Sequence, residues 1–354
     1  MAGAEDKHTP GSGRPTSRDV AKLAGVSHTA VSFVFNGRAE GNLSPATQER
    51  IRQAAAQLDY RPNPVARGLR SRRTAVIGLV TDEIASTPFA GRLLRGAMET
   101  AWDSEHLVLT VDSGGDPAKE DAAVAELLDR RVDGIIYAAM SLRRVRVPEG
   151  LHRTHSVFAN CVPEDGSLPA VIPAERAGGR AAARLLLAQG HREVAVVGGE
   201  ADIASVERLQ GFRAALRAEG VTVPRERVVR TGGEISSGYE GALRLLDGAA
   251  AGRCPTGLFC YNDRVATGVL HAAAQLGLTV PSDLSVIGYD DQEHLAAFLS
   301  PPLTTVALPH RAMGEAAVRL VLDAIGTGRM PNPTVRRIAC PVIDRESVGP
   351  APSR

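Results

Sequence analysis

The chain has 354 residues, 44% of them hydrophobic, which is enough for a small domain and a larger one with a buried core. It contains no run of about 18 uncharged apolar residues and no apolar stretch near its start, so neither a membrane span nor an export signal is expected. The net charge of +1 is unevenly spread, because residues 1–73 hold 12 Lys and Arg against 6 Asp and Glu, and the remainder holds 29 against 34. A basic head on an acidic body is typical of a nucleic-acid reader attached to a domain with another task.

Residues 16–61 predict a helix-turn-helix domain that follows a disordered tail, residues 1–15. A first helix begins after a cap at Thr16 and ends at Gly25, which permits a tight left-handed turn. Ser27 can cap a second helix that runs to Phe35. A third helix starts at Ser44-Pro45 and packs across the other two. Two short helices about a glycine-containing turn indicate a domain whose second helix enters the DNA major groove.

The same residues carry a family resemblance. The run from Asp19 to Ser32, followed by Asn36-Gly37, resembles the signature of the lactose/galactose-repressor (LacI/GalR) family of bacterial regulators, and residues 58–70 resemble that family's hinge. The resemblance continues at intervals to about residue 345. It implies a repressor of transcription that binds a double-stranded DNA operator as a homodimer and responds to a small-molecule effector.

The resemblance assigns DNA-binding residues. His28 and Thr29 would face base edges, while Ser27, Ser32 and Asn36 would hold phosphates and fix the register. Phe33 stands where many relatives carry an arginine that can fork onto a guanine; a phenylalanine can contact a thymine methyl group or pack inward, but it cannot donate. The full set expected at DNA is Thr16, Ser27, His28, Thr29, Ser32, Phe33, Asn36, Ala66 and Leu69.

Residues 62–73 predict a hinge helix or linker. Pro62, Pro64 and Gly68 leave a helical segment of about six residues, which is too short to be stable alone. The resemblance implies that two copies fold together in the minor groove, with Leu69 as the wedge between base pairs and Ala66 allowing close approach. The alternative is a solvated linker. A paired hinge predicts a dimer on an inverted repeat, and the absence of a C-terminal heptad run predicts no coiled-coil tetramer.

Residues 74–346 predict an α/β effector-binding and dimerisation domain, followed by a C-terminal tail, residues 347–354. Short apolar runs alternate with amphipathic helical stretches, which indicates parallel sheets covered on both faces. The length favours two lobes, and the resemblance is to periplasmic sugar-binding proteins. The predicted strands are 75–80, 107–111, 134–139, 156–159, 194–197, 257–260 and 284–287. The predicted helices are 88–103, 118–131, 174–189, 205–219, 238–251 and 264–276.

Loop residues after these strands are the candidate effector contacts, because ligands of parallel sheets bind at the carboxyl ends of the strands. Asp82, Phe89 and Asn160 follow strands, and the resemblance matches Arg208, Asn262 and Asp290 to positions that hold the effector by hydrogen bonds. For Arg208 and Asp290 the alternative is a structural salt bridge; as ligand contacts, their removal should abolish the effector response and leave the fold intact. Forked donors and acceptors suit a polyhydroxylated ligand. The resemblance implies a sugar, the family's commonest ligand, with a purine or another metabolite as the alternative. The chain departs from relatives at Pro173-Ala174-Glu175-Arg176, where a pair beginning with Asp is common.

Other functions are disfavoured. A solute-binding protein would need export, and it would have no use for the basic head. An enzyme is not expected, because the sequence contains no G-x-S-x-G, P-loop or H-E-x-x-H motif. The cysteines (Cys161, Cys254, Cys260, Cys340) are scattered without a metal-binding spacing, so we expect buried thiols, no metal and no cofactor. The expected location is the cytoplasm, at the nucleoid when bound to an operator.

Overall fold

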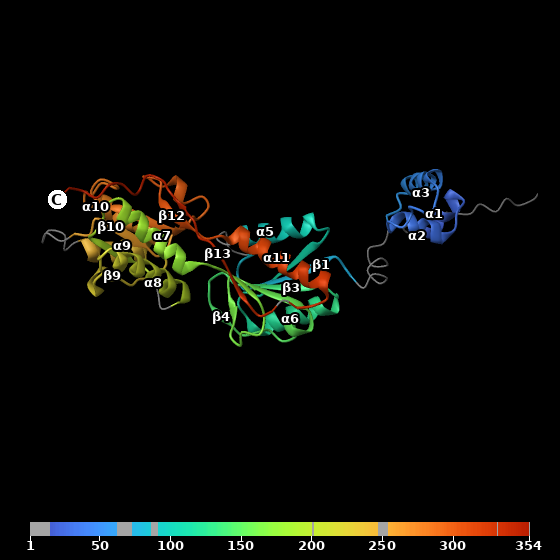
Figure 1. Cartoon of the computed structure of the whole chain (residues 1–354), viewed down its shortest axis with the longest axis horizontal. Helices are drawn as coiled ribbons and strands as arrows, with labels where there is room; N and C mark the ends of the chain where they lie inside the picture. The colour runs from blue at the N-terminus through green and yellow to red at the C-terminus, as the bar shows by residue number, and fades with distance from the viewer. Residues whose placement is uncertain are drawn as a thin grey trace, which may run out of the picture. The chain divides into compact units, whose positions relative to one another are not determined.

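The computed structural model describes residues 15–61, 73–85, 91–199, 202–246, 254–330 and 332–353 (Figure 1). The chain divides into two compact units, residues 1–74 and 75–354. Among the described helices, none is both long enough and apolar enough to cross a membrane.

The first unit is a three-helix domain formed by α1 (Ser17–Ala24), α2 (His28–Phe35) and α3 (Pro45–Gln57). Its caps follow the sequence: the Asp19 carboxylate accepts hydrogen bonds from the Thr16 backbone N–H at 2.9 Å and from its hydroxyl at 2.7 Å, which lowers the pKa of Asp19. Gly25 adopts φ +63° at the turn before α2. Val20, Val31 and Ile51, one from each helix, form the centre of a small apolar core.

Lobe 1 of the second unit is a six-stranded sheet in which every pair is parallel. In spatial order its strands are β13 (Val335–Ile338), β7 (Ala170–Pro173), β5 (His155–Ala159), β3 (Gly134–Ala138), β1 (Val76–Thr81) and β2 (Leu107–Asp112). One face is covered by α5 (Gly91–Asp103) and α11 (His310–Thr327), the other by α6 (Pro117–Asp129). A short ribbon pairs β4 (Arg144–Val145) with β6 (Val162–Pro163), near a 3-10 turn at Leu151–Arg153.

Lobe 2 is a second six-stranded sheet, parallel except for its last strand. In spatial order its strands are β14 (Val342–Ile343), β12 (Thr304–Ala307), β11 (Ser285–Asp290), β10 (Gly257–Cys260), β8 (Val194–Val197) and β9 (Val228–Val229). Its faces are covered by α7 (Glu175–Ala188) with α8 (Ile203–Ala218), and by α9 (Ile235–Leu246) with α10 (Asp263–Gln275). Two 3-10 turns lie at Arg225–Arg227 and Ala296–Phe298.

The chain passes between the lobes three times, after β7, after β12 and after β13. Lobe 1 therefore takes α11 and β13 from the C-terminal part of the sequence. The predicted two-lobed α/β fold with parallel sheets is confirmed, and each apolar run named above forms a strand.

The segment expected as a C-terminal tail lies against lobe 2. The Ser347 hydroxyl donates to the Val286 carbonyl at 2.6 Å, and the buried His191 ring contacts the Gly349 carbonyl at 3.0 Å. Burial lowers the pKa of His191, so this ring is held in its neutral form between strands and tail. All four cysteines are buried.

Candidate functional site

A cavity of about 300 Å³ lies between the lobes, at the carboxyl ends of β3, β5, β10 and β11. Lobe 1 contributes residues that follow β3 and β5, and lobe 2 contributes the remainder. The lining residues are Met140, Ser141, Leu142, Asn160, Glu175, Asp202, Ala204, Arg208, Gly233, Tyr261, Asn262, Arg264, Asp290 and Leu308. Four of the six predicted effector contacts, Asn160, Arg208, Asn262 and Asp290, therefore line one polar cavity.

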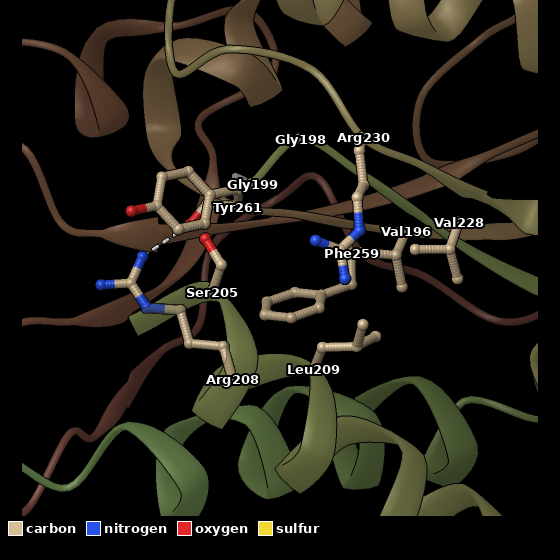
Figure 2. A pocket seen from close by; sticks show the side chains of 10 residues that line it. All are labelled: Val196, Gly198, Gly199, Ser205, Arg208, Leu209, Val228, Arg230, Phe259 and Tyr261. Carbon is tan, nitrogen blue, oxygen red and sulfur yellow. Dashed lines mark hydrogen bonds between the residues drawn. The ribbon is translucent and has the colours of Figure 1, made fainter. Parts of the chain in front are cut away.

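Arg208 is the most heavily bonded side chain of this cavity. Its Nε and Nη2 donate to the two carboxylate oxygens of Glu175 at 2.8 and 2.9 Å, and its Nη1 donates to the Tyr261 carbonyl at 2.7 Å, the dashed line in Figure 2. Its guanidinium also lies 3.7 Å from the centre of the Tyr289 ring. Burial opposes the charge of Arg208, but the carboxylates of Glu175 and Asp290 outweigh it and raise the pKa of Arg208.

Close packing of α7 on α8 brings this ion pair together. A Cβ atom at Gly179 of α7 would lie 2.0 Å from the Arg208 carbonyl oxygen, and one at Gly211 of α8 would lie 2.0 Å from the Arg176 carbonyl oxygen. Glycine at both positions lets the two backbones touch, so Glu175 in the first turn of α7 reaches Arg208 in the middle of α8. The Arg208 and Glu175 side chains are 5% and 2% exposed, which makes the pair a buried one.

Asp290 ends β11 beside the same guanidinium, with its Oδ1 at 3.6 Å from Arg208 Nη2. Burial raises the pKa of Asp290 well above its ordinary value, although Arg208 opposes the shift. The backbone of Asp290 has φ +111°, a conformation that non-glycine residues rarely adopt. A strained, buried acid facing a cavity is typical of a ligand-binding position.

Asn160 and Asn262 both line the cavity, and they differ in how far they are already engaged. The Asn160 amide donates to the Ala139 and Met140 carbonyls at 2.9 and 3.0 Å, and these bonds use its N–H groups and not its oxygen. Asn262 caps α10, since its oxygen accepts from the Val265 N–H at 2.8 Å and its amide donates to the Gly233 carbonyl at 3.0 Å. Asn262 therefore also fixes the loops of lobe 2.

Of the remaining two predicted contacts, Asp82 does not line this cavity. Asp82 is buried beneath it, where its carboxylate accepts hydrogen bonds from the Met140 N–H at 2.9 Å and from Arg143 at 3.0 Å. Asp82 thus positions Met140, which does line the cavity. Phe89 lies outside the described residues.

Sequence reasoning missed five polar lining residues, which are Ser141, Glu175, Asp202, Tyr261 and Arg264. The only sequence signal for Glu175 was that residues 173–176 depart from the pattern of relatives. Tyr261 and Arg264 lie next to the predicted Asn262 or two residues from it. Figure 2 shows Ser205, Arg208 and Tyr261 converging at the edge of a small hollow in lobe 2. Burial raises the pKa of Tyr261 to about 12, so its hydroxyl remains a donor.

In the head, the start of α2 is open to solvent. His28 and Thr29 are exposed, and the His28 Nε2 atom contacts the Ser17 hydroxyl at 2.8 Å. Ser27 caps the helix through the Ala30 N–H. The Asn36 amide donates to the Ser32 carbonyl at 2.6 Å, which closes the end of α2.

Of the three further predicted DNA contacts, only Phe33 lies within the described residues. Phe33 is half-buried, and the core cluster is formed instead with its neighbours Val34 and Phe35. Ala66 and Leu69 lie outside the described residues.

Each of the two units matches a known protein family. Residues 16–63 match the profile described as bacterial regulatory proteins, lacI family, and residues 183–348 match a periplasmic binding protein-like domain. The chain is 32% identical over 314 residues to the HTH-type transcriptional repressor PurR of Vibrio atlanticus, covering 88% of this chain and 92% of the relative. It is 33% identical over 313 residues to the PurR of Vibrio cholerae serotype O1, covering 88% and 91%.

Solved structures agree with this match. A lac repressor dimer bound to operator and the anti-inducer ONPF is similar with a TM-score of 0.77 and 25% identity, covering 95% of this chain and 100% of the other. The transcriptional regulator CelR in complex with cellobiose is similar with a TM-score of 0.63 and 29% identity, covering 94% and 100%.

Proposed function

The chain belongs to the LacI family of bacterial regulatory proteins and is a transcriptional repressor, not an enzyme, and on this premise we propose how it is controlled. It acts in the cytoplasm as a homodimer on an inverted-repeat operator, and a small polyhydroxylated effector, a sugar or sugar derivative, sets its operator affinity. Residues 16–61 read DNA, residues 62–73 form the hinge, and residues 74–346 bind effector and the second copy.

The observation that supports a neutral effector is the ion pairing of Arg208. Its charge is already balanced by Glu175, so an anionic ligand finds no free counter-charge there. The cavity still offers an amide oxygen at Asn160, an acid at Asp290 and a hydroxyl at Tyr261. Hydroxyl groups both donate and accept, so a neutral polyol matches this mixture better than an acid. A similar regulator was solved with cellobiose, which supports the same class.

The effector can regulate operator affinity because its proposed contacts lie on both lobes. Asn160 belongs to lobe 1, whereas Arg208 and Asp290 belong to lobe 2. A ligand that bonds to both lobes favours one lobe arrangement over another, and it can change DNA affinity only through that difference.

Calorimetry against a panel of neutral sugars and nucleobases tests the effector class, followed by operator titration with and without the hit. We expect a neutral sugar to bind and to shift operator affinity. Binding confined to nucleobases would contradict the sugar assignment, and operator affinity that no bound ligand alters would contradict the control.

A homodimer is supported by exposed apolar side chains along the β2 edge of lobe 1. Met98 and Trp102 of α5 are 44% and 71% exposed, and Leu107 and Leu109 of β2 are 57% and 41% exposed. Exposed large apolar side chains along one edge are typical of an interface, and a symmetric dimer covers such an edge with the same edge of its twin.

Trp102→Glu should therefore yield monomers in analytical ultracentrifugation. Val335→Glu is the control, because Val335 is 41% exposed on β13, the opposite edge of the same sheet. Dimers that persist in Trp102→Glu would contradict this interface.

A further inference from the structure

A second cavity, of about 660 Å³, opens between the lobes on the side of β4 and β13, and it is larger than the effector pocket. Lobe 1 supplies Arg144, Arg337 and an apolar wall; lobe 2 supplies the starts of α7 and α8, including Arg176 and Arg180. The segment that crosses from β7 to α7 forms part of its lining. We call this space the arginine cavity.

The arginine cavity carries an excess of positive charge. It is lined by four arginines and two glutamates, but Glu175 is engaged by Arg208, and Glu207 accepts from Arg176 at 2.9 and 3.1 Å. Arg144, Arg180 and Arg337 remain, and within the described part of the chain none of them has a carboxylate within 4.0 Å. Three like charges around one hollow repel one another unless an anion joins them.

The apolar lining of the arginine cavity favours an organic ligand over an inorganic ion. Leu142, Leu168 and Ile172 are buried at this surface, and Val335 on β13 is 41% exposed beside Arg337. A cavity of this size holds a small organic molecule, and the apolar wall would bury a hydrocarbon body while the arginines hold the charged end. Guanidinium groups bind phosphate through paired donors, and three of them suit a dianion better than a single carboxylate.

We propose that the arginine cavity is a second ligand site, distinct from the effector pocket, which binds a small organic phosphate monoester. Arg144 and Arg337 belong to lobe 1 and Arg180 to lobe 2, so a bound phosphate bridges the lobes. It therefore stabilises one lobe arrangement and adds a second input to operator affinity. The coupling to DNA rests on the proposed function, whereas the binding does not.

The test of binding uses the full chain and phenyl phosphate, with phenol as the uncharged probe and chloride holding the ionic strength constant. Calorimetry should show saturable binding of one phenyl phosphate per chain and none of phenol. Arg337→Glu should weaken it by about 10- to 100-fold, the loss expected for a charged hydrogen-bonded contact. The matched control is Arg336→Glu, since Arg336 is the neighbouring exposed residue on β13, points to the other side of the strand and does not line the cavity.

A second matched pair is Arg180→Glu and Arg184→Glu, both on α7, of which only Arg180 lines the cavity. Absence of saturable phenyl phosphate binding, or equal losses in the cavity variants and their controls, would overturn the site.

The coupling is tested by operator titration with and without saturating phenyl phosphate. We expect operator affinity to change by at least about threefold in the wild type and to stay constant in Arg337→Glu. Saturable binding with unchanged operator affinity would refute the coupling alone. A chain that binds phenyl phosphate but no operator would refute the proposed function and leave the site standing.

Discussion

Replacing Arg208 by Met removes the guanidinium and keeps most of the side-chain volume, so it tests what the buried ion pair contributes. The Glu175 carboxylate, with its side chain 2% exposed, would lose both of its short hydrogen bonds from Arg208. Leaving one charge of a buried pair unpaired costs about 3–5 kcal/mol of unfolding free energy. The sequence alone favoured an Arg208 that could be removed without harm to the fold, and this geometry revises that expectation.

A double-mutant cycle separates the charge from the packing. Arg208→Met combined with Glu175→Leu removes both charges, so the double variant should recover most of the lost stability and lie within about 1–2 kcal/mol of the wild type. Urea unfolding followed by circular dichroism measures each free energy. Arg217→Met, an exposed arginine on the same helix, is the control for substitution as such.

The outcome that refutes this reasoning is a double variant as unstable as Arg208→Met, because the two positions would then be uncoupled. Effector binding gives the second readout. Both variants should bind the effector about 30- to 1,000-fold more weakly whether or not stability recovers, since they lack the guanidinium N–H groups that the bonds to Glu175 and Tyr261 leave available to a ligand. Wild-type effector affinity in the stable double variant would make Arg208 a purely structural residue.

Three other perturbations probe separate features. Leu69→Ala should weaken operator binding far more than binding to random DNA, because a lost wedge leaves the phosphate contacts in place; equal losses in a binding titration would exclude a wedge. Gly179→Ala should lower the unfolding free energy by about 1–3 kcal/mol, since its Cβ meets the Arg208 carbonyl at 2.0 Å, whereas Gly326→Ala in α11, with open space around it, should be neutral or stabilising in the same urea titration. Burial raises the pKa of Asp263 to about 7 although Thr305 and the Gln292 N–H bond its carboxylate, so between about pH 4 and 7 the folded state keeps a proton that the unfolded state has released. The unfolding free energy of the wild type relative to Asp263→Asn should therefore fall by up to about 4 kcal/mol as pH rises across that window, and a difference that grows with pH would contradict the assignment.

The strands with continuous apolar sequence could be predicted because both faces of each sheet are covered, as at Gly134–Ala138. β13 could not, since its sequence Val-Arg-Arg-Ile lies at an exposed edge and shows no apolar run. The helix α11 has a visible apolar period, but chain order places it after lobe 2, and no local pattern says that it returns to cover lobe 1.

The residues of the effector cavity could likewise be predicted only in part. Asn160 follows a strand and Asp290 ends one, so position along the chain was enough to nominate them, whereas Arg208 lies within α8 and was nominated by the family resemblance. The Glu175–Arg208 pair joins residues on two helices whose contact depends on the glycines of α7 and α8, and sequence separation gives no sign of it. Asp82 follows a strand as well, yet it bonds the loop at Met140, because a carboxylate near a strand end satisfies backbone N–H groups as readily as a ligand does.

The late return of the chain to lobe 1 has a consequence for synthesis on the ribosome. The three-helix head needs only about the first 60 residues and can fold as soon as they emerge, whereas the apolar face of lobe 1 awaits Met313, Val318 and Val321 of α11. For most of its translation the nascent chain therefore contains a folded DNA-binding domain and a lobe 1 sheet whose apolar face is exposed. A ribosome that stops before residue 310 releases a head without a regulated body, and the bare face of the sheet exposes such a fragment to aggregation and proteolysis before it can occupy operators unregulated.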